Sequence, residues 1–230
     1  MMAVTKRFVA ALAALTLLPV AACSGGATTT DEVSYQVTEP VTALVVAARA
    51  ASVEITVGDG PISVTEVHRY SSDKPSTAHQ VDGQALRLTE SGCGDDNAHC
   101  QVEFRIRMPK ATSAEIEAKA GAVKVNGLGG DVRVTTEAGA VEAKALTSDQ
   151  VTIQTSAGAA SLEFAEAPTM VKATTDLGAV SVRVPAGDSY AIAAKAKTGS
   201  TEVSVPKDPA STHRIEVSTQ LGAIKIETLT

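Results

Sequence analysis

The sequence predicts an all-β protein, a single-chain parallel β-solenoid (β-helix) built from short strands with about 20 residues in each coil. Three observations favour this fold. A glycine-centred phrase recurs along the chain, apolar residues alternate on both sides of each glycine, and charges of opposite sign lie one repeat apart. With 44% hydrophobic and 20% charged residues, the 230-residue chain can bury a core, and neither a disordered tail nor a polytopic membrane protein fits.

Residues 1–22 are predicted to be a lipoprotein signal peptide. Lys6 and Arg7 are followed by 13 uncharged residues, fewer than the roughly 20 apolar residues that a membrane-spanning helix needs. This run ends in Leu-Pro-Val-Ala-Ala-Cys at Cys23, which resembles the bacterial lipobox, where the Cys is diacylglycerated and then exposed by cleavage. The alternative is an ordinary secretory peptide cut at an Ala-x-Ala-like site, with Cys23 left free or removed.

The cysteine count supports the lipid interpretation. The chain has three Cys, and an odd number leaves one thiol without a partner in an oxidising compartment. Acylation of Cys23 leaves Cys93 and Cys100 to form a disulfide. We therefore expect a protein anchored on the extracytoplasmic face of the cell membrane by diacylglycerol and palmitate on Cys23. Residues 23–32, rich in Ser, Gly, Ala and Thr at their start, are expected to be a flexible tether.

Upstream of the regular repeats the chain is less uniform. If Ala51 takes the place of a repeat glycine, then Leu44, Val46, Val53 and Ile55 occupy the apolar columns. Residues 58–110 are irregular and are expected to cap the stack of coils. Within them the pattern predicts strands at Ile62–Val67, Ala85–Thr89 and Val102–Met108, a loop at Ser71–Ala78 and a turn-rich crossing at Gly92–Cys100. Residues 33–230 are thus one domain.

Residues 111–230 carry the regular repeats, in which the phrase small-Gly-small-apolar-x-apolar occurs six times. The positions seven and five before each glycine, and two and four after it, are mostly Val, Ile, Leu or Ala. This alternation predicts two short strands per repeat, each with one buried face, joined by a bend that glycine permits. The repeat-turn glycines, spaced 18 to 23 residues apart, are Gly121, Gly139, Gly158, Gly178, Gly199 and Gly222.

The charges at outward positions indicate that the repeats stack as parallel coils. Residues one repeat apart are then lateral neighbours, so opposite charges are favourable. Chance among mixed surface charges is the alternative. The pairs are Glu115 and Arg133, Lys119 and Glu137, and Lys124 and Glu142, and a further column holds Lys144, Glu163 and Arg183.

The stretch from Met108 to Val132, which contains MPK and then AEIEAKAGAVKVNGLGGDV, resembles the adhesin-like β-strand-repeat family of bacterial surface proteins. The similarity extends over roughly Ala43 to Thr230. It implies a right-handed single-chain parallel β-solenoid at the cell surface, in a family without an assigned biochemical role. This chain departs from the pattern in having Ala where many repeats carry Ser or Asp after the Gly, and in its Cys-bearing insertion.

The side chains suited to chemistry have simple structural interpretations. Cys93, Asp95, Asp96, His99 and Cys100 include enough ligand types for zinc or calcium, but a disulfide-closed loop tip with solvated acids is the simpler interpretation. We therefore predict no metal and no cofactor. The remaining histidines are isolated in sequence and expected at the surface; they are His68, His79 and His213.

No catalytic residue is predicted. Glu142, Glu163 and Glu202 share columns with Lys, Arg or Ser, as solvated faces do, and no common nucleophile, metalloprotease, dinucleotide or phosphate-loop motif occurs.

A column of Thr stands three residues before four of the glycines and could form an ice-binding ladder. Its parity matches the buried columns, so we expect it to point inward. Its members are Thr136, Thr155, Thr175 and Thr219, with Ala118 and Ala196 completing it.

These features predict a lipid-anchored, extracytoplasmic and non-catalytic module that binds or adheres to an envelope protein or glycan. The alternatives are a glycan-active enzyme on a solenoid scaffold and an envelope carrier of a hydrophobic molecule, which would need a cavity that a narrow Val and Ala core does not leave. A net charge of −6 and 3% aromatic residues argue against nucleic acid as a partner, and the lipid anchor is the expected contact with the membrane.

Overall fold

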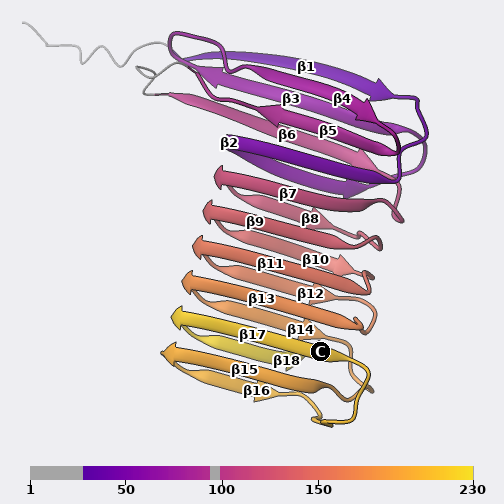
Figure 1. Ribbon diagram of the computed structural model, residues 1–230, viewed down its shortest axis with the longest axis vertical. Coiled ribbons are helices and arrows are strands. Elements are labelled where there is room, and N and C mark those ends of the chain that lie inside the picture. The colour runs from indigo at the N-terminus through magenta and orange to yellow at the C-terminus, as the bar shows by residue number, and fades with distance from the viewer. Residues whose placement is uncertain (1–27, 94–98, 230) are drawn as a thin grey trace, which may run out of the picture.

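The computed structural model describes residues 28–93 and 99–229 of the chain. The predicted signal peptide, residues 1–22, and Cys23 lie outside these residues. The described chain forms an elongated stack of coils in which two sheets face each other, and it contains no helix (Figure 1). The prediction of an all-β solenoid is confirmed. Since no helix is described, none is long and apolar enough to cross a membrane in this part of the chain.

The strands of the repeats run parallel to their lateral neighbours and alternate between the two sheets. In chain order they are β7 (Ser113–Ala120), β8 (Val123–Asn126), β9 (Val132–Ala138), β10 (Val141–Leu146), β11 (Gln150–Ala157), β12 (Ala160–Phe164), β13 (Met170–Leu177), β14 (Val180–Val184), β15 (Ala191–Thr198), β16 (Thr201–Ser204), β17 (Arg214–Leu221) and β18 (Ile224–Thr228). The odd-numbered strands form one face of the rod, which we call sheet B, and the even-numbered strands form the other, sheet A.

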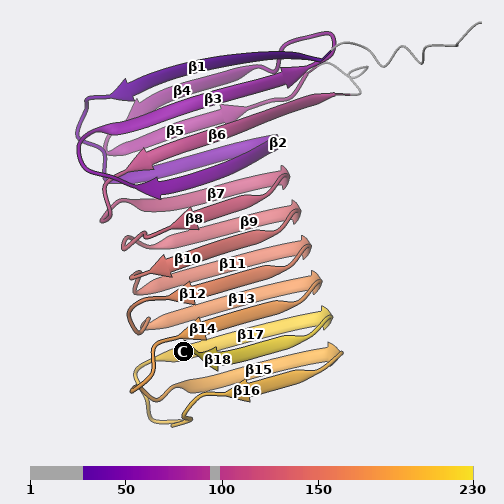
Figure 2. The ribbon, with the colours of Figure 1, turned by 180° about the vertical axis from the view of Figure 1, so that it is seen from behind.

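An N-terminal cap closes one end of the rod, as both views show (Figures 1 and 2). Its strands are β1 (Thr29–Val37), β2 (Ala43–Val57), β3 (Ile62–Tyr70), β4 (Thr77–Asp82), β5 (Ala85–Glu90) and β6 (Cys100–Met108). β2 is one coil in a single strand: its first half pairs with β5 and β7 in sheet B, and its second half pairs with β6 and β8 in sheet A. Beyond it, β1, β3 and β6 pair antiparallel, as do β4 and β5.

The predicted alignment of the cap with the repeat positions is confirmed, but two predicted segment boundaries are wrong. Ala50 pairs with Ala120 and Val53 with Val123, so Ala51 occupies the place of a repeat glycine. The loop predicted at Ser71–Ala78 is too long, because β4 begins at Thr77 as a hairpin partner of β5. The tether predicted for residues 23–32 is also too long: β1 begins at Thr29, since residues 29–37 pair along the whole of β3.

The lateral pairing that the charges predicted is present in the repeats. Glu115 lies opposite Arg133, and Lys124 lies opposite Glu142. Glu163 lies opposite Arg183 and forms an ion pair with it at 3.2 Å. Lys144 departs from its predicted column, because a bulge between Ala143 and Leu146, with Ala145 at a φ of 50°, shifts the register there. The Lys144 ammonium instead pairs with Glu142 on its own strand.

The order of the last two coils corrects the prediction that every coil lies on the next. The final coil, β17–β18, pairs with β13–β14 on one side and with β15–β16 on the other, so β15–β16 ends the rod. The apolar columns of β17–β18 hold Ile215, Val217, Ile224 and Ile226, whereas the equivalent positions of β15–β16 hold Ile192, Ala194, Thr201 and Val203. Burying the more apolar coil on both sides removes more hydrocarbon from water.

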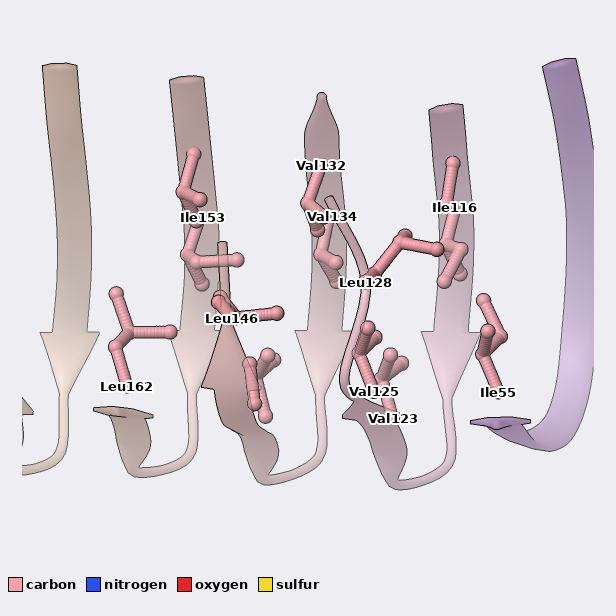
Figure 3. Close-up of a cluster of buried hydrophobic side chains, with 14 of the residues drawn as sticks. Ile55, Ile116, Val123, Val125, Leu128, Val132, Val134, Leu146, Ile153 and Leu162 are labelled. Atoms are coloured by element: carbon pink, nitrogen blue, oxygen red, sulfur yellow. The ribbon is translucent and has the colours of Figure 1, made fainter. Parts of the chain in front are cut away.

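The core is a set of stacked apolar columns between the sheets (Figure 3). Ile116, Val134 and Ile153 form one column of sheet B, and Val125 and Leu162 face them from sheet A; all are buried. The Thr column points inward as predicted, since Thr136, Thr155, Thr175 and Thr219 are all buried. Two of its hydroxyls donate to the carbonyl oxygen of a glycine in the neighbouring coil, Thr175 to Gly158 and Thr219 to Gly178.

Candidate functional site

The six predicted repeat-turn glycines lie in one line along a corner of the rod. All have positive φ, from 129° at Gly199 to 157° at Gly222. A β-carbon on Gly158 would lie 1.9 Å from the carbonyl oxygen of Gly139, and the same close approach recurs along the line. These glycines therefore let the coils meet at the corner with the spacing of adjacent strands, about 4.8 Å. Their role is structural.

The outer face of sheet B carries a shallow groove near the ends of four strands and the middle of β2. It has a volume of about 570 Å³ and crosses β5, β2, β7, β9 and β11. Small residues such as Ala47 form part of its floor, and charges of both signs lie among them. The charged residues that line it are Arg49, Glu90, Glu117, Lys119 and Glu137.

Glu90 has a structural task at the edge of this groove. It is the last residue of β5, and its side chain is buried. The Oε2 atom accepts hydrogen bonds from the backbone N–H groups of Arg49 and Ala50, each at 2.8 Å. The carboxylate thus replaces the strand that would otherwise satisfy these two donors, where β2 continues past the end of β5.

The predicted disulfide joins Cys93 to Cys100 at the end of the cap. Asp95 and Asp96, which the sequence offered as metal ligands, lie outside the described residues. Among the residues that are described, no three His, Cys, Asp or Glu side chains are grouped so that they could hold a metal ion. A second surface hollow of about 420 Å³ lies beside the disulfide, where Arg69, His99 and Gln101 line it.

Replacing both Cys93 and Cys100 by Ser should lower the free energy of unfolding by about 2 kcal/mol. The bond closes a loop of seven residue steps, and closing a loop of this length removes that much chain entropy from the unfolded state. Urea unfolding of the purified variant and the parent chain measures the difference. An unchanged midpoint would mean that the bond does not constrain the unfolded chain, and adding reductant to the parent should reproduce the variant.

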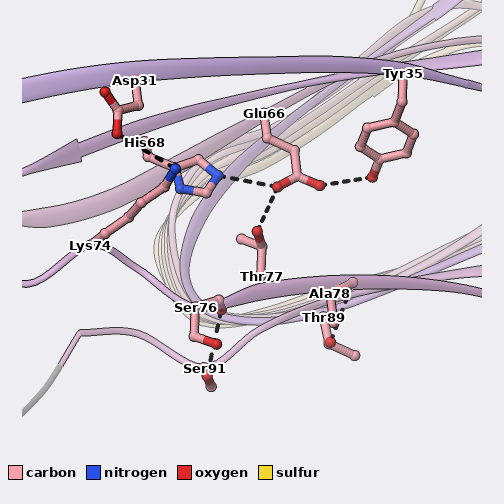
Figure 4. A network of polar contacts seen from close by, with 10 residues as sticks. All are labelled: Asp31, Tyr35, Glu66, His68, Lys74, Ser76, Thr77, Ala78, Thr89 and Ser91. Carbon is pink, nitrogen blue, oxygen red and sulfur yellow. Dashed lines mark hydrogen bonds and ion pairs between the residues drawn. The ribbon is translucent and has the colours of Figure 1, made fainter.

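A buried polar cluster lies inside the cap, between β3 and the strands that cover it (Figure 4). The centre is Glu66, which is 4% exposed. Its carboxylate accepts hydrogen bonds from the hydroxyls of Tyr35, at 2.7 Å, and Thr77, at 2.6 Å, and lies 3.1 Å from Nε2 of His68. The cluster joins β1, β3 and β4, so it ties the two edge strands of the cap to its centre.

The ionisation of this cluster follows from its contacts. Burial alone would raise the pKa of Glu66, but the hydrogen bonds from Thr77, Tyr35 and His68 outweigh it and hold that pKa below its usual value. Burial and the hydrogen bond to Glu66 raise the pKa of Tyr35 far above its ordinary value. Tyr70, which lies on β3 as Glu66 does, donates a hydrogen bond from its hydroxyl to Asp31 on β1 at 2.8 Å. Lys74 forms an ion pair with Asp31 at 3.5 Å.

The histidines are placed differently from the expectation. His68 is only 2% exposed, so the prediction of a surface position is wrong for it. It shares the inward parity of Ile62, Val64 and Glu66 on β3, and this alternation was the signal that could have placed it. His79 is exposed and stacks on Tyr35, with ring centres 4.1 Å apart. His213 is half-buried and hydrogen-bonds the carbonyl oxygen of Pro168 at 2.8 Å.

The acidic side chains of the repeats lie on separate parts of the outer surface. Glu142 and Glu163 lie on the outer face of sheet A, each paired with a cation of its own. A hydrogen bond from Lys144 lowers the pKa of Glu142. Glu202 lies at the far end of the rod, on β16. These three carboxylates therefore do not converge on one groove as a glycosidase pair would.

Comparisons with known proteins identify relatives of this rod. A family model described as Toastrack DUF4097 matches residues 48–227. A candidate cell adhesion protein from Clostridium sporogenes is 15% identical, with a TM-score of 0.54, over 87% of this chain and 100% of that one. A candidate adhesin from Bacteroides fragilis is 14% identical, with a TM-score of 0.51, over 89% and 99% of the two chains. No curated protein sequence matches the chain.

Proposed function

The chain belongs to the Toastrack DUF4097 family, and we propose that it is a non-catalytic adhesion module held on the extracytoplasmic face of the cell membrane by lipid on Cys23. The observation that carries the proposal is the rod itself. A filled core runs between two sheets whose outer faces carry regularly spaced charges of both signs. Such a surface suits recognition of an extended partner better than capture of a small molecule in a pocket.

Two further observations support this function. Two solved structures with TM-scores above 0.5 are named for cell adhesion and as an adhesin, and both share the fold over nearly their whole length. The hollows described above lie on the outer surface, and the interior is filled by side chains such as Phe104, Phe164 and Tyr190. A filled interior does not favour the carrier of a hydrophobic molecule.

The proposed anchor fixes which end of the rod faces the membrane. Only five residues separate Cys23 from Thr29, the first residue of β1. Six residue steps span at most about 20 Å, so an acylated Cys23 holds the cap within that distance of the bilayer. The opposite end, formed by β15 and β16, is then the part of the rod farthest from the anchor, where it can meet another surface.

The anchor is tested by expressing the chain and its Cys23→Ser variant in a bacterium that acylates lipoproteins. We expect the parent chain to be recovered with the membrane and to carry a diacylglycerol mass on Cys23, because several acyl chains anchor a protein firmly. The variant should lose this mass. A parent chain without acyl groups, or cleaved elsewhere than before Cys23, would contradict the anchor. Release of oligosaccharides from wall or capsule polysaccharides would contradict the non-catalytic role.

A further inference from the structure

We propose that the terminal coil β15–β16 is a docking surface for the same coil of a second copy of this chain, forming a tail-to-tail dimer. The outer edges of β15 and β16 are open, whereas residues 206–208 pair with Tyr190, just before β15, and cover the edge there. Among the described residues, β15 pairs only with β17 and β16 only with β18, whereas the strands between β2 and the terminal coil have a lateral neighbour on both sides. Two rows of backbone donors and acceptors are therefore available for pairing with another strand.

The interior of the rod is also partly uncovered at this end, on the side of the bend, while Tyr190 and Val205 at the other side are buried. The columns that are buried in the neighbouring coil, at Ile215 and Val217 for example, are only half-buried at Ile192 and Ala194. On β16, Val203 is half-buried, and Thr201 is exposed where its equivalent on β18, Ile224, is buried. A second copy placed over this end would cover these positions as a further coil does elsewhere in the rod.

A two-fold axis can place two such ends together in two ways. An axis perpendicular to the sheets pairs β15 with β15 and β16 with β16 of the second copy. An axis parallel to the strands pairs β15 of each copy antiparallel with β16 of the other. Both arrangements keep inward residues facing inward, and both close after two copies.

Charge selects the second arrangement. The outward side of β15 carries Lys195 and Lys197, and the outward side of β16 carries Glu202 and Ser204; all four are exposed. The bend between the strands is Gly199–Ser200, so symmetry about it places Lys197 opposite Glu202 of the second copy and Lys195 opposite Ser204. The same register places inward Ala196 opposite inward Val203. The other arrangement would bring Lys near Lys and Glu near Glu.

Lys197 is available for this contact. It forms no ion pair within the described part of the chain. Its lateral position on β17 is that of Gln220, because the flanking pairs are Ala196 with Thr219 and Thr198 with Leu221. Lysines on an edge strand also oppose pairing with strands that lack an acid, so the second copy is favoured over an arbitrary strand.

The cap end differs, because its edge strands β1 and β4 run antiparallel to their neighbours and are tied to the cluster around Glu66. A two-fold contact through β15–β16 closes after two copies, with the two caps at opposite ends of a rod of double length. Bridging of membranes rests on the proposed function: if each cap is anchored in a membrane through Cys23, the dimer joins two membranes. The adhesion is then homophilic, and many weak contacts between two surfaces add through multivalency.

The dimer is tested by exchanging charges in the acylated full-length chain in a zwitterionic detergent, with analytical ultracentrifugation as the measurement. We expect Lys197→Glu and Glu202→Lys each to weaken dimerisation about tenfold or more. The contact between residues 197 and 202 occurs twice in the dimer, so each variant places two pairs of like charges opposite each other. The double variant should return to within about threefold of the parent. Lys172→Glu, an exposed change in mid-rod, is the control and should leave dimerisation unchanged. A monomeric parent, or a dimer that ignores both single changes, would overturn the proposal.

Clustering of vesicles separates this inference from the anchor. The same chains are incorporated into phosphatidylcholine vesicles, and flotation first establishes whether the protein is membrane-bound. Clustering by the parent and the double variant, with loss in both single variants, would support homophilic bridging. Dimers in detergent without clustering of loaded vesicles would support the interface and contradict the adhesive role. Protein that fails to float would contradict the anchor, while the detergent result still decides the interface.

Discussion

Replacing Gly158 by Ala should lower the free energy of unfolding by about 3 kcal/mol or more. Gly158 lies in the middle of the rod, and a β-carbon there would be 1.9 Å from the carbonyl oxygen of Gly139 and 2.6 Å from its carbonyl carbon. Both atoms belong to the backbone of the adjacent coil, so relief requires that two coils move apart and lose lateral hydrogen bonds. Urea or thermal unfolding of the purified variant measures the loss.

Gly187→Ala is the matched control for this change. Gly187 also has a positive φ, of 107°, but no heavy atom lies within 4 Å of the position its β-carbon would take. This variant therefore carries only the conformational cost of a non-glycine residue, about 1 kcal/mol. Equal losses in the two variants would show that backbone conformation alone, and not the close approach of coils, explains the glycine at the corner.

The repeat could be predicted from the sequence because the same steric and packing requirements recur in every coil. Wherever two coils meet at the corner, a side chain is excluded, and wherever a strand faces the interior, an apolar residue is needed every second position. Ala51 could be placed at a corner without a glycine because Leu44, Val46, Val53 and Ile55 keep that alternation. Ala51 tolerates a side chain there because it lies within one continuous strand, without the positive φ of the repeat-turn glycines.

The parts that the sequence did not predict depend on choices between similar pairings. The coil that contains Gly199 and the coil that contains Gly222 have the same register, so either could pair with β13–β14. Only a comparison of their inward side chains shows that Ile215 and Val217 together have more apolar surface than Ile192 and Ala194. The shift at Ala145 follows from one extra residue that no motif marks. Glu66 and His68 are polar residues at inward positions of β3, so a search for alternating apolar residues did not place them inside.

Replacing Glu66 by Ala should destabilise the cap by about 3 to 5 kcal/mol. The change leaves the hydroxyls of Tyr35 and Thr77 and the ring of His68 without their shared acceptor inside the protein, and unpaired buried polar groups are costly. Glu103→Ala is the control. Glu103 lies on the outer side of the same sheet and pairs with Arg69 and Arg105, so it should cost about 1 kcal/mol or less. Urea unfolding compares the two.

The pH dependence of stability distinguishes a charged Glu66 from a neutral one. Because the folded protein holds the pKa of Glu66 below its usual value of 4.5, the ionised carboxylate stabilises the fold above that pH, and its contribution is lost as pH falls through the lower folded pKa. The free energy of unfolding of the parent should therefore fall steeply in acid. Asp31, whose hydrogen bond from Tyr70 also lowers its pKa, keeps part of that slope in the Glu66→Ala variant. The variant should fall less steeply than the parent below pH 4.5, and parallel curves would mean that the pKa of Glu66 is the same in the folded and unfolded states.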